Sequence, residues 1–415
     1  MKIHLYGNTL NNSYYLATFL RACGYDAEMF LDDSSSLQQD YPWWEDSHLN
    51  EHNLPSWIHY YRVNPNFMFP QPKLKEMINH FSKCDIALVC GWGPIIAKRA
   101  GVPYLFYSFG GDLTVTAFYE NIREAFRKMA SFKKPSGLRS LLLYSHYQRE
   151  AIRQADRVGI LMAFQIEPYA RKLGVVEKMK LLRLAWDIEK YKKSPDPALN
   201  EKYKNYDIVY FMIARHSWKS VWNDMKGNDK FLKAYARFVK EKNPNVLLVT
   251  IDKGVDTDAS KELLRELGVE HAVEWVKEMN KDRIRAYISM SNVVVVDQFW
   301  HDNWRRRYPR NETPAFGLGS AGIEAMCAEA VLITGFFHED FYEGNKPPIL
   351  NAFTEEEIYQ RLVQSLSMTP DERAELGKKA RAFVEKYHGW KNVVPMYVEV
   401  LEEILEERHR KKLHS

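Results

Sequence analysis

Short apolar segments alternate with longer amphipathic segments along almost all of the 415 residues. Each apolar segment is long enough for one strand, and each amphipathic segment is long enough for one helix. This alternation is typical of α/β proteins, in which helices connect parallel strands. The run Val293–Val296 is continuously apolar, as expected of a central strand that is buried on both faces. The sequence therefore predicts an α/β protein with doubly wound parallel sheets.

The predicted strands form two series. Those of the first half are Ile3–Gly7, Asp85–Gly91, Tyr104–Tyr107, Asp156–Leu161 and Met179–Leu184. Those of the second half are Asp207–Ala214, Asn245–Ile251, His271–Val276, Asn292–Asp297 and Ala330–Thr334. The segment 189–205 between the two series is polar and contains Pro195 and Pro197, so it is expected to be a linker.

Two facing Rossmann-like domains are therefore expected, over residues 1–188 and 206–390. Ligands of such sheets bind beyond the carboxyl ends of the strands, which would place a site in the cleft between the domains. The C-terminal region is helical by pattern, with an interruption at Gly389-Trp390. Its last helix, over 391–411, is expected to complete the first domain.

Charge and composition exclude several classes of protein. The net charge of +4 is too small to indicate a nucleic-acid partner, although it suits ligands that carry phosphate. The chain begins with a strand-like segment rather than a signal peptide, and no apolar run approaches the roughly 18 residues that span a bilayer. A cytoplasmic location is expected.

A glycine-rich segment, Gly317-Leu318-Gly319-Ser320, precedes a predicted helix that carries Glu324. Amide groups at the start of a helix bind phosphate, with help from the helix dipole. Glu324 lies about one turn further on and could accept hydrogen bonds from ribose or sugar hydroxyls. A diphosphate site beside a hydroxyl acceptor suits a nucleotide sugar, but a simple strand–helix turn would leave the same pattern.

Two cations follow the first strand of the second series. Arg215 comes just after that strand, and Lys226 lies at the start of the next predicted helix. Positive groups at this edge can stabilise the charge that develops on a diphosphate leaving group. They could also be ordinary solvated surface residues.

The order of these motifs resembles that of retaining glycosyltransferases of family 4, which have the GT-B fold. Arg215, the segment Lys226-Gly227-Asn228-Asp229 and the segment Glu324-Ala325-Met326 match motifs of the nucleotide-binding domain of that family. The strand Ala155-Asp156-Arg157-Val158 and the passage from Leu173-Gly174-Val175 to Trp186-Asp187 are similar to motifs of its first domain. The resemblance implies two domains with the GT-B architecture and a C-terminal helix that crosses back to the first.

The resemblance also implies roles for individual residues. Arg215 and Lys226 would contact the donor phosphates, with Lys219 as a second candidate because the spacing departs from the family pattern. Glu324 would bind the ribose hydroxyls. The glutamate that contacts the transferred sugar in the family is replaced here by Phe316. Asp297 and Gln298 are candidates to take over that contact.

In the first domain, two turns follow strands and are expected at the acceptor side. The turn Gly7–Asn12 is polar, and Asn12 is its candidate acceptor-side residue. The second turn, Tyr107–Asp112, resembles a family turn without its histidine, and Asp112 is a candidate to orient an acceptor hydroxyl. His146 and His216 are further candidates, although a single histidine more often has a structural role.

No metal site and no cofactor are predicted. Asp256-Thr257-Asp258 resembles the D-x-D metal motif of another transferase fold, but it precedes a predicted helix for which Asp258 is a candidate N-cap. His48 and His52 lie four positions apart without the glutamate of the H-E-x-x-H zinc motif.

Two basic segments have two interpretations each. Arg305-Arg306-Arg307 could bind an acidic acceptor or donor phosphates, or could be a solvated loop. The segment Arg123–Arg153 mixes apolar and basic residues. It could touch the inner face of an anionic membrane that presents a lipid-linked acceptor, or its helices could pack on the first sheet.

The predicted function is transfer of a sugar from a UDP- or GDP-sugar to a hydroxyl of a carbohydrate, lipid-linked or small-molecule acceptor, with retention and without a metal. Three alternatives on the same fold stay open: a nucleotide-sugar 2-epimerase, a phosphorylase, and a non-catalytic protein that binds sugar nucleotides.

Overall fold

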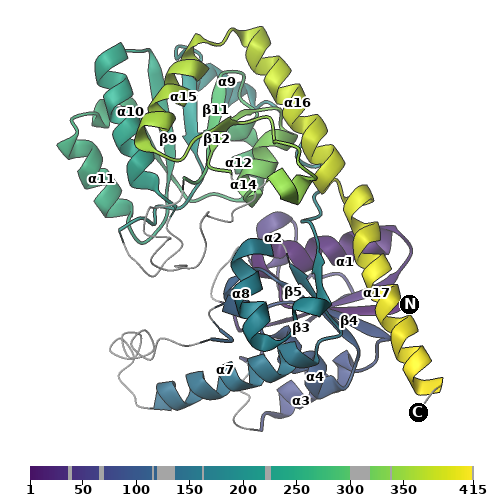
Figure 1. Cartoon of the computed structure of the whole chain (residues 1–415). Coiled ribbons are helices and arrows are strands. Elements are labelled where there is room, and N and C mark those ends of the chain that lie inside the picture. The colour runs from purple at the N-terminus through teal and green to yellow at the C-terminus, as the bar shows by residue number, and fades with distance from the viewer. Residues whose placement is uncertain are drawn as a thin grey trace. The chain divides into compact units, whose positions relative to one another are not determined.

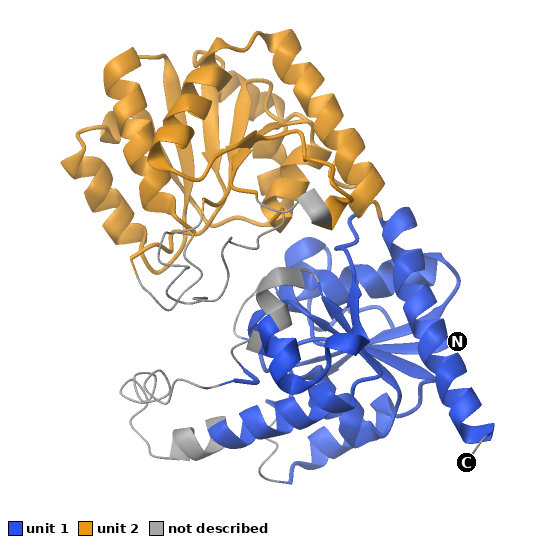
Figure 2. Cartoon of the chain, viewed as in Figure 1, with its two compact units in different colours: residues 1–186, 390–415 blue, residues 187–389 orange. Residues whose placement is uncertain are grey.

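The computed structural model describes residues 1–35, 40–64, 70–114, 116–118, 136–160, 163–219, 226–299, 318–336 and 339–413. The chain divides into two compact units. Unit 1 comprises Met1–Trp186 and Trp390–Ser415, and unit 2 comprises Asp187–Gly389 (Figure 2). Each unit contains a parallel sheet with helices on both faces (Figure 1). The prediction of two doubly wound α/β domains is confirmed.

Unit 1 is built on a seven-stranded sheet in the order β3-β2-β1-β4-β5-β6-β7, and every strand pair is parallel. Its strands are β1 Lys2–Tyr6, β2 Asp26–Asp32, β3 Ile58–Tyr61, β4 Ile86–Val89, β5 Tyr104–Ser108, β6 Arg157–Ile160 and β7 Met179–Leu181. Its helices are α1 Asn12–Ala22, α2 Pro42–Glu45, α3 Pro72–Phe81, α4 Gly93–Ala100, α5 Gly111–Thr114, α7 Ser136–Gln154, α8 Ala163–Leu173 and α17 Trp390–Leu413.

Unit 2 contains a six-stranded parallel sheet in the order β10-β9-β8-β11-β12-β13. Its strands are β8 Ile208–Met212, β9 Val246–Asp252, β10 Val273–Lys277, β11 Val293–Val296, β12 Val331–Thr334 and β13 Leu350–Asn351. Its helices are α9 Pro197–Tyr203, α10 Asn228–Lys242, α11 Thr257–Glu266, α12 Lys281–Ile288, α14 Ser320–Cys327, α15 Glu355–Ser367 and α16 Pro370–His388.

The segment 189–205, expected to be a linker, lies within unit 2 and ends in α9. Asp196 caps this helix by accepting hydrogen bonds from the amides of Ala198 and Leu199. Leu199 and Tyr203 are buried. The polar and proline residues of this segment suggested a linker. Some of them form the N-cap and the first turn of a packed helix instead.

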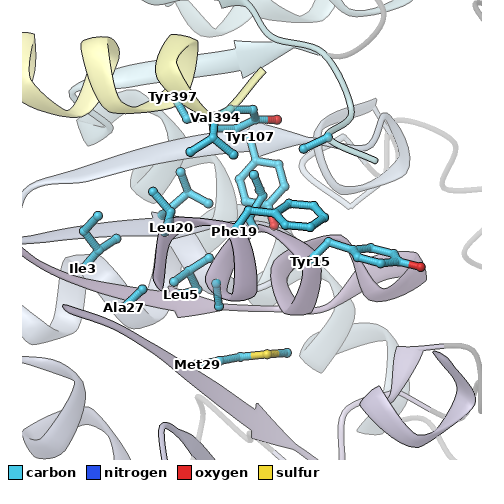
Figure 3. Packing of buried hydrophobic residues seen from close by; sticks show 14 of the residues in the cluster. Ile3, Leu5, Tyr15, Phe19, Leu20, Ala27, Met29, Tyr107, Val394 and Tyr397 are labelled. Atoms are coloured by element: carbon cyan, nitrogen blue, oxygen red, sulfur yellow. The ribbon is translucent and has the colours of Figure 1, made fainter. Parts of the chain in front are cut away.

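The last helix, α17, packs on the sheet of unit 1 (Figure 1). Val394, Tyr397 and Leu401 of α17 belong to the buried cluster that also contains Leu5 of β1 and Phe19 of α1, as Figure 3 shows for most of these side chains. The ring of Trp390 stacks on Phe19 at a centroid distance of 5.2 Å. One apolar face of the first sheet is thus covered by residues that lie far apart in the sequence.

In both sheets the order of the strands reverses beside the first strand of the unit. This reversal lies between β1 and β4 in unit 1 and between β8 and β11 in unit 2. Connections leave these neighbouring strands toward opposite faces of the sheet, which opens a crevice at their carboxyl ends. The segments that follow β1, β4, β8 and β11 are therefore the places where each unit can hold a ligand.

Candidate functional site

The loop after β8 and the start of α10 meet at the reversal point of unit 2. The amide of Lys226 donates to the carbonyl of Ser217 over 2.7 Å, and the amide of Ser217 donates to Oδ1 of Asn228 over 3.0 Å. Arg215 lies two residues before Ser217 and is half-buried. The structure therefore joins the loop that carries Arg215 to the segment that carries Lys226.

The segment after β11 completes this edge of the sheet. The amide of Phe299 donates to the carbonyl of Lys226 over 2.8 Å, and Nζ of Lys226 donates to Oε1 of Gln298 over 2.6 Å. Asp297 and Gln298 are both almost fully buried. Lys226, Asp297 and Gln298, selected separately from the sequence, are thus neighbours in the structure.

Gly319 brings the start of α14 against the same residues. A Cβ atom at this position would lie 2.9 Å from Oδ2 of Asp297 and 3.2 Å from Nε2 of Gln298. Only glycine, which has no Cβ atom, allows the side chains of Asp297 and Gln298 to lie so close to the backbone at this position. Gly319 is the N-cap of α14, and as a glycine it has no side chain with which to cap the helix. The amides of its first turn, including that of Ser320, are therefore the kind of groups that bind an anion.

Glu324 lies one turn into α14 and is fully buried. Its Oε1 forms an ion pair with Nζ of Lys281, the first residue of α12. An ionised carboxylate has about four acceptor positions, so it can accept from a hydroxyl beside an ion pair. Lys281 was not predicted, because it lies 43 positions from Glu324 and no local pattern links the two.

Lys219 and Asp256 show how the loop after β8 is held. Oδ2 of Asp256 accepts hydrogen bonds from the amides of Trp218 and Lys219 over 2.7 and 2.9 Å. Asp256, not Asp258, is the N-cap residue of α11, so the predicted N-cap is wrong by two positions. Asp258 lies in the first turn, where its charge suits the helix dipole. Asp256 therefore positions the loop that bears Arg215.

His216 is a structural residue of this loop. Its side chain is fully buried, and its two ring nitrogens lie 2.9 Å from the hydroxyls of Ser260 and Thr250. Burial lowers the pKa of His216 to about 4, so the ring is neutral at pH 7. With both nitrogens occupied, it is not a ligand-binding group. His146, the other histidine candidate, is exposed on α7.

In unit 1, Asp112 organises the turns after β4 and β5. Its Oδ1 accepts a hydrogen bond from the hydroxyl of Ser108 over 2.6 Å, and its Oδ2 accepts from the amides of Gly91 and Phe109 over 3.2 and 3.3 Å. Burial raises the pKa of the Asp112 carboxyl, an effect that these hydrogen bonds oppose. Asp112 thus lies at the predicted edge of the sheet, but three of its contacts are structural.

Asn12 is buried at the start of α1. Its Nδ2 donates to the carbonyl of Thr9 over 2.9 Å, which closes the turn after β1. Leu10 and Asn11 in this turn adopt positive φ angles of 54° and 59°. Gly7, also at positive φ, has no room for a side chain because a Cβ would lie 2.5 Å from the carbonyl oxygen of Cys90. The structure therefore gives Asn12 a turn-forming role.

Several predicted features lie outside the described residues. They are Gly317, Phe316, Arg305–Arg307 and the part of the segment 123–153 that precedes residue 136. Within α7, Ala151 and Ile152 are buried in the core of unit 1, so the end of this segment packs on the first sheet. Among the described residues, no helix is long and apolar enough to cross a membrane.

Asp297 is expected to make the free energy of unfolding depend on pH. Burial raises the pKa of its carboxyl to about 6, and nearby Lys226 lowers it only in part. An unfolded aspartate titrates near 3.9, so between about pH 4 and pH 6 the folded state binds more protons. The free energy of unfolding therefore falls as the pH rises through this window.

We expect Asp297→Asn to remove this dependence. Relative to the variant, the wild type should lose about 2 kcal/mol of unfolding free energy between pH 4.5 and pH 7. Urea unfolding of both proteins at the two pH values measures the difference. Parallel pH profiles for the two proteins would show that Asp297 is ionised throughout.

Comparison with known proteins gives one matching family and many similar structures. Residues 219–383 match the family described as Glycosyl transferases group 1. No curated protein sequence matches the chain.

Two of the similar structures are bacterial proteins that align over nearly their whole length. The structure of Anabaena Alr3699/HepE with UDP and glucose is 15% identical, with a TM-score of 0.64, and the match covers 97% of this chain and 100% of that one. A glycosyltransferase from Rickettsia africae is 15% identical, with a TM-score of 0.65 and coverage of 97% and 98%.

The sucrose-phosphate synthase of Thermosynechococcus elongatus is a third similar structure. It is 14% identical, with a TM-score of 0.62 and coverage of 98% of this chain and 100% of that one. At these identities the structures establish a shared fold, and the fold extends over both units.

Proposed function

We propose that this chain is a GT-B glycosyltransferase that transfers a sugar from a nucleoside diphosphate donor to an acceptor hydroxyl. Its residues 219–383 match the family of group 1 glycosyl transferases. The observation that carries this proposal is the meeting of Lys226, Gln298 and Gly319 at the strand reversal of unit 2. There a cation and the amides of the first turn of α14 lie at the place where a doubly wound sheet binds its ligand.

In this proposal the donor diphosphate lies at the start of α14. Gly319 allows the phosphate to approach the helix amides, and Arg215 and Lys226 supply positive charge. Their attraction grows as the bond between sugar and phosphate breaks, because negative charge then accumulates on the leaving diphosphate. These groups make a metal ion unnecessary for leaving-group departure.

Glu324 would accept hydrogen bonds from the ribose of the donor, and Asp297 with Gln298 would contact the transferred sugar. Support for the choice of donor comes from Anabaena Alr3699/HepE, which shares the fold and was crystallised with UDP, with UDP and glucose, and with UDP-glucose. A UDP-sugar is therefore the first donor to test, followed by a GDP-sugar.

We propose retention of configuration at the sugar carbon. The leaving phosphate would then accept the proton of the acceptor hydroxyl on the face from which it departs, so no protein carboxylate has to act as a nucleophile. The acceptor would be a hydroxyl of a carbohydrate or of a lipid-linked carrier. Anomeric analysis of the product by NMR tests the stereochemistry.

A thermal-shift panel tests the donor site. UDP-, GDP- and ADP-sugars are added to the wild type, to Arg215→Ala and to Lys219→Ala, which removes the second candidate for the phosphate contact. The correct donor at 100 times its Kd should stabilise the wild type by about 2.7 kcal/mol. It should stabilise Arg215→Ala much less and Lys219→Ala as well as the wild type.

Equal stabilisation of all three proteins would remove Arg215 from the donor site. Loss of stabilisation in Lys219→Ala alone would transfer the phosphate role to Lys219. Turnover of the donor to an epimer without any acceptor would contradict sugar transfer and identify an epimerase.

A further inference from the structure

Unit 1 contains a cluster of three histidines and one glutamate that the proposed function does not use. Glu28 of β2, His59 of β3 and His80 of α3 offer one nitrogen or oxygen atom each, and these atoms all lie within 4.8 Å of one another. His4 of β1 adjoins them, with its Nε2 3.6 Å from Oε2 of Glu28. We propose that His4, Glu28, His59 and His80 form a binding site for a zinc ion.

The parallel register places these residues on one face of the sheet. His4 pairs with Glu28 across β1 and β2, and Phe30, two residues after Glu28, pairs with His59 across β2 and β3. Residues two apart in a strand share a face. Helix α3 covers this face through Leu74, Met77 and Phe81, and it carries His80 to the same point. The cluster is therefore fixed by regular elements rather than by loops.

One carboxylate oxygen is the centre of the cluster. Oε2 of Glu28 lies 2.8 Å from Nε2 of His59 and 3.6 Å from Nε2 of both His4 and His80. Zinc bonds of about 2.0–2.1 Å in tetrahedral geometry separate neighbouring ligand atoms by roughly 3.3 Å. The three distances from Oε2 of Glu28 lie on either side of this spacing.

His4 provides the strongest sign that a cation belongs here. Its side chain is fully buried, and Nδ1 lies 2.8 Å from the carbonyl oxygen of Phe81. A carbonyl can only accept, so Nδ1 carries the proton and Nε2 presents a lone pair in the neutral ring. Within the described part of the chain, this Nε2 has no hydrogen-bond partner. A buried lone pair that faces a carboxylate oxygen is unfavourable unless a positive ion lies between them.

The other ligands are prepared in the same way. Nδ1 of His80 lies 2.9 Å from the hydroxyl of Tyr61, a contact that can fix the ring with Nε2 toward Glu28. Such outer contacts orient the histidines of most protein metal sites. Nζ of Lys2 binds Oε1 of Glu28 over 2.7 Å and so leaves Oε2 for the cluster.

Zinc binds imidazole in its neutral form and a carboxylate in its ionised form. Three histidines and one glutamate would fill the four positions of a tetrahedral site, as in structural rather than catalytic zinc sites.

The test uses the full chain without a histidine tag, freed of metal by a chelator. Zn²⁺ binding is measured by titration calorimetry, and Co²⁺ is used as a spectroscopic substitute whose absorption bands report tetrahedral coordination. We expect one ion per chain in the wild type, tetrahedral Co²⁺ bands, and a rise in melting temperature with Zn²⁺ but none with Mg²⁺.

Four variants locate the site. His80→Gln and Glu28→Gln should weaken Zn²⁺ binding by more than about 100-fold, and Tyr61→Phe by about 10- to 100-fold. His52→Gln is the matched control, because that side chain is 74% exposed and lies outside the cluster. It should bind as the wild type does. His80 is 30% exposed, so its variant should fold, which circular dichroism verifies.

Equal Zn²⁺ binding by the wild type and His80→Gln would overturn the proposal, as would the absence of binding in the wild type. Octahedral Co²⁺ bands would also contradict it. Donor binding at unit 2 is a separate measurement, so neither result depends on the proposed transfer reaction.

Discussion

The Lys226→Ala variant is expected to lose sugar transfer by a factor of about 10²–10³ while it retains its fold. Lys226 is half-buried, and its ammonium group lies beside Gln298 and near the buried Asp297. A cation held in this way needs little reorganisation when charge develops on the leaving diphosphate. Its interaction with that charge is also stronger than it would be in water.

The measurement is kcat/KM for transfer with the donor found by the thermal-shift panel. Lys233→Ala is the matched control, since Lys233 lies on the same helix and its side chain is 42% exposed. This control should retain the wild-type rate within about threefold. If Lys226→Ala also retained it, Lys226 would not stabilise the leaving group.

The Glu324→Ala variant is expected to be destabilised by about 3–5 kcal/mol. Glu324 is fully buried, and its partner Lys281 is only 19% exposed, so removal of the carboxylate leaves a poorly solvated cation in unit 2. The exposed pair between Lys204 and Glu201 provides the comparison. Loss of that pair through Glu201→Ala should cost no more than about 1 kcal/mol.

A double variant separates the stability of this pair from its proposed role with the donor. Lys281→Met with Glu324→Leu replaces two charges by apolar side chains of similar size and should recover most of the lost stability. It should not recover stabilisation by the nucleotide sugar, because no acceptor for the ribose hydroxyls remains. Recovery of donor binding in the double variant would show that Glu324 acts only through its pair with Lys281.

Most of the fold could be predicted from the sequence, because central parallel strands are continuous apolar runs. All ten predicted strands are present, among them β11 at Val293–Val296. The predicted break between the last two helices is also confirmed, because α16 ends at His388 with Gly389 as its C-cap. Glycine is needed there, since a Cβ atom would lie 2.5 Å from the carbonyl oxygen of Glu385. These features have local causes and leave local patterns.

The strands β2 and β3 could not be predicted in the same way. Glu28 lies within β2 and His59 within β3, so neither segment is an uninterrupted apolar run. Their polar side chains are tolerated inside because they face each other and His80 across the sheet and α3. Such compensation depends on residues up to 52 positions apart, and a local pattern cannot contain it.

For the candidate site, the sequence indicated the sheet edge better than it indicated the contacts. The end of a predicted strand led to Arg215, the glycine-rich segment led to Gly319, and the resemblance to family 4 led to Asp297 and Gln298. The structure connects the segments that carry them. The sequence could not reveal that Asp256 holds the amides of Trp218 and Lys219. That contact requires the loop after β8 to lie beside the start of α11, which only the tertiary fold determines.

Because α17 belongs to unit 1, the second unit is an insertion between Trp186 and Trp390. The two crossing points are adjacent, since the amide of Trp390 donates to the carbonyl of Trp186 over 3.1 Å. During synthesis the first unit therefore stays incomplete, with the apolar surface around Leu5 and Phe19 uncovered, until α17 leaves the ribosome. Unit 2 does not need α17, so it can finish folding before unit 1 does. A premature stop codon before residue 390 would remove α17 and leave this apolar surface of unit 1 uncovered.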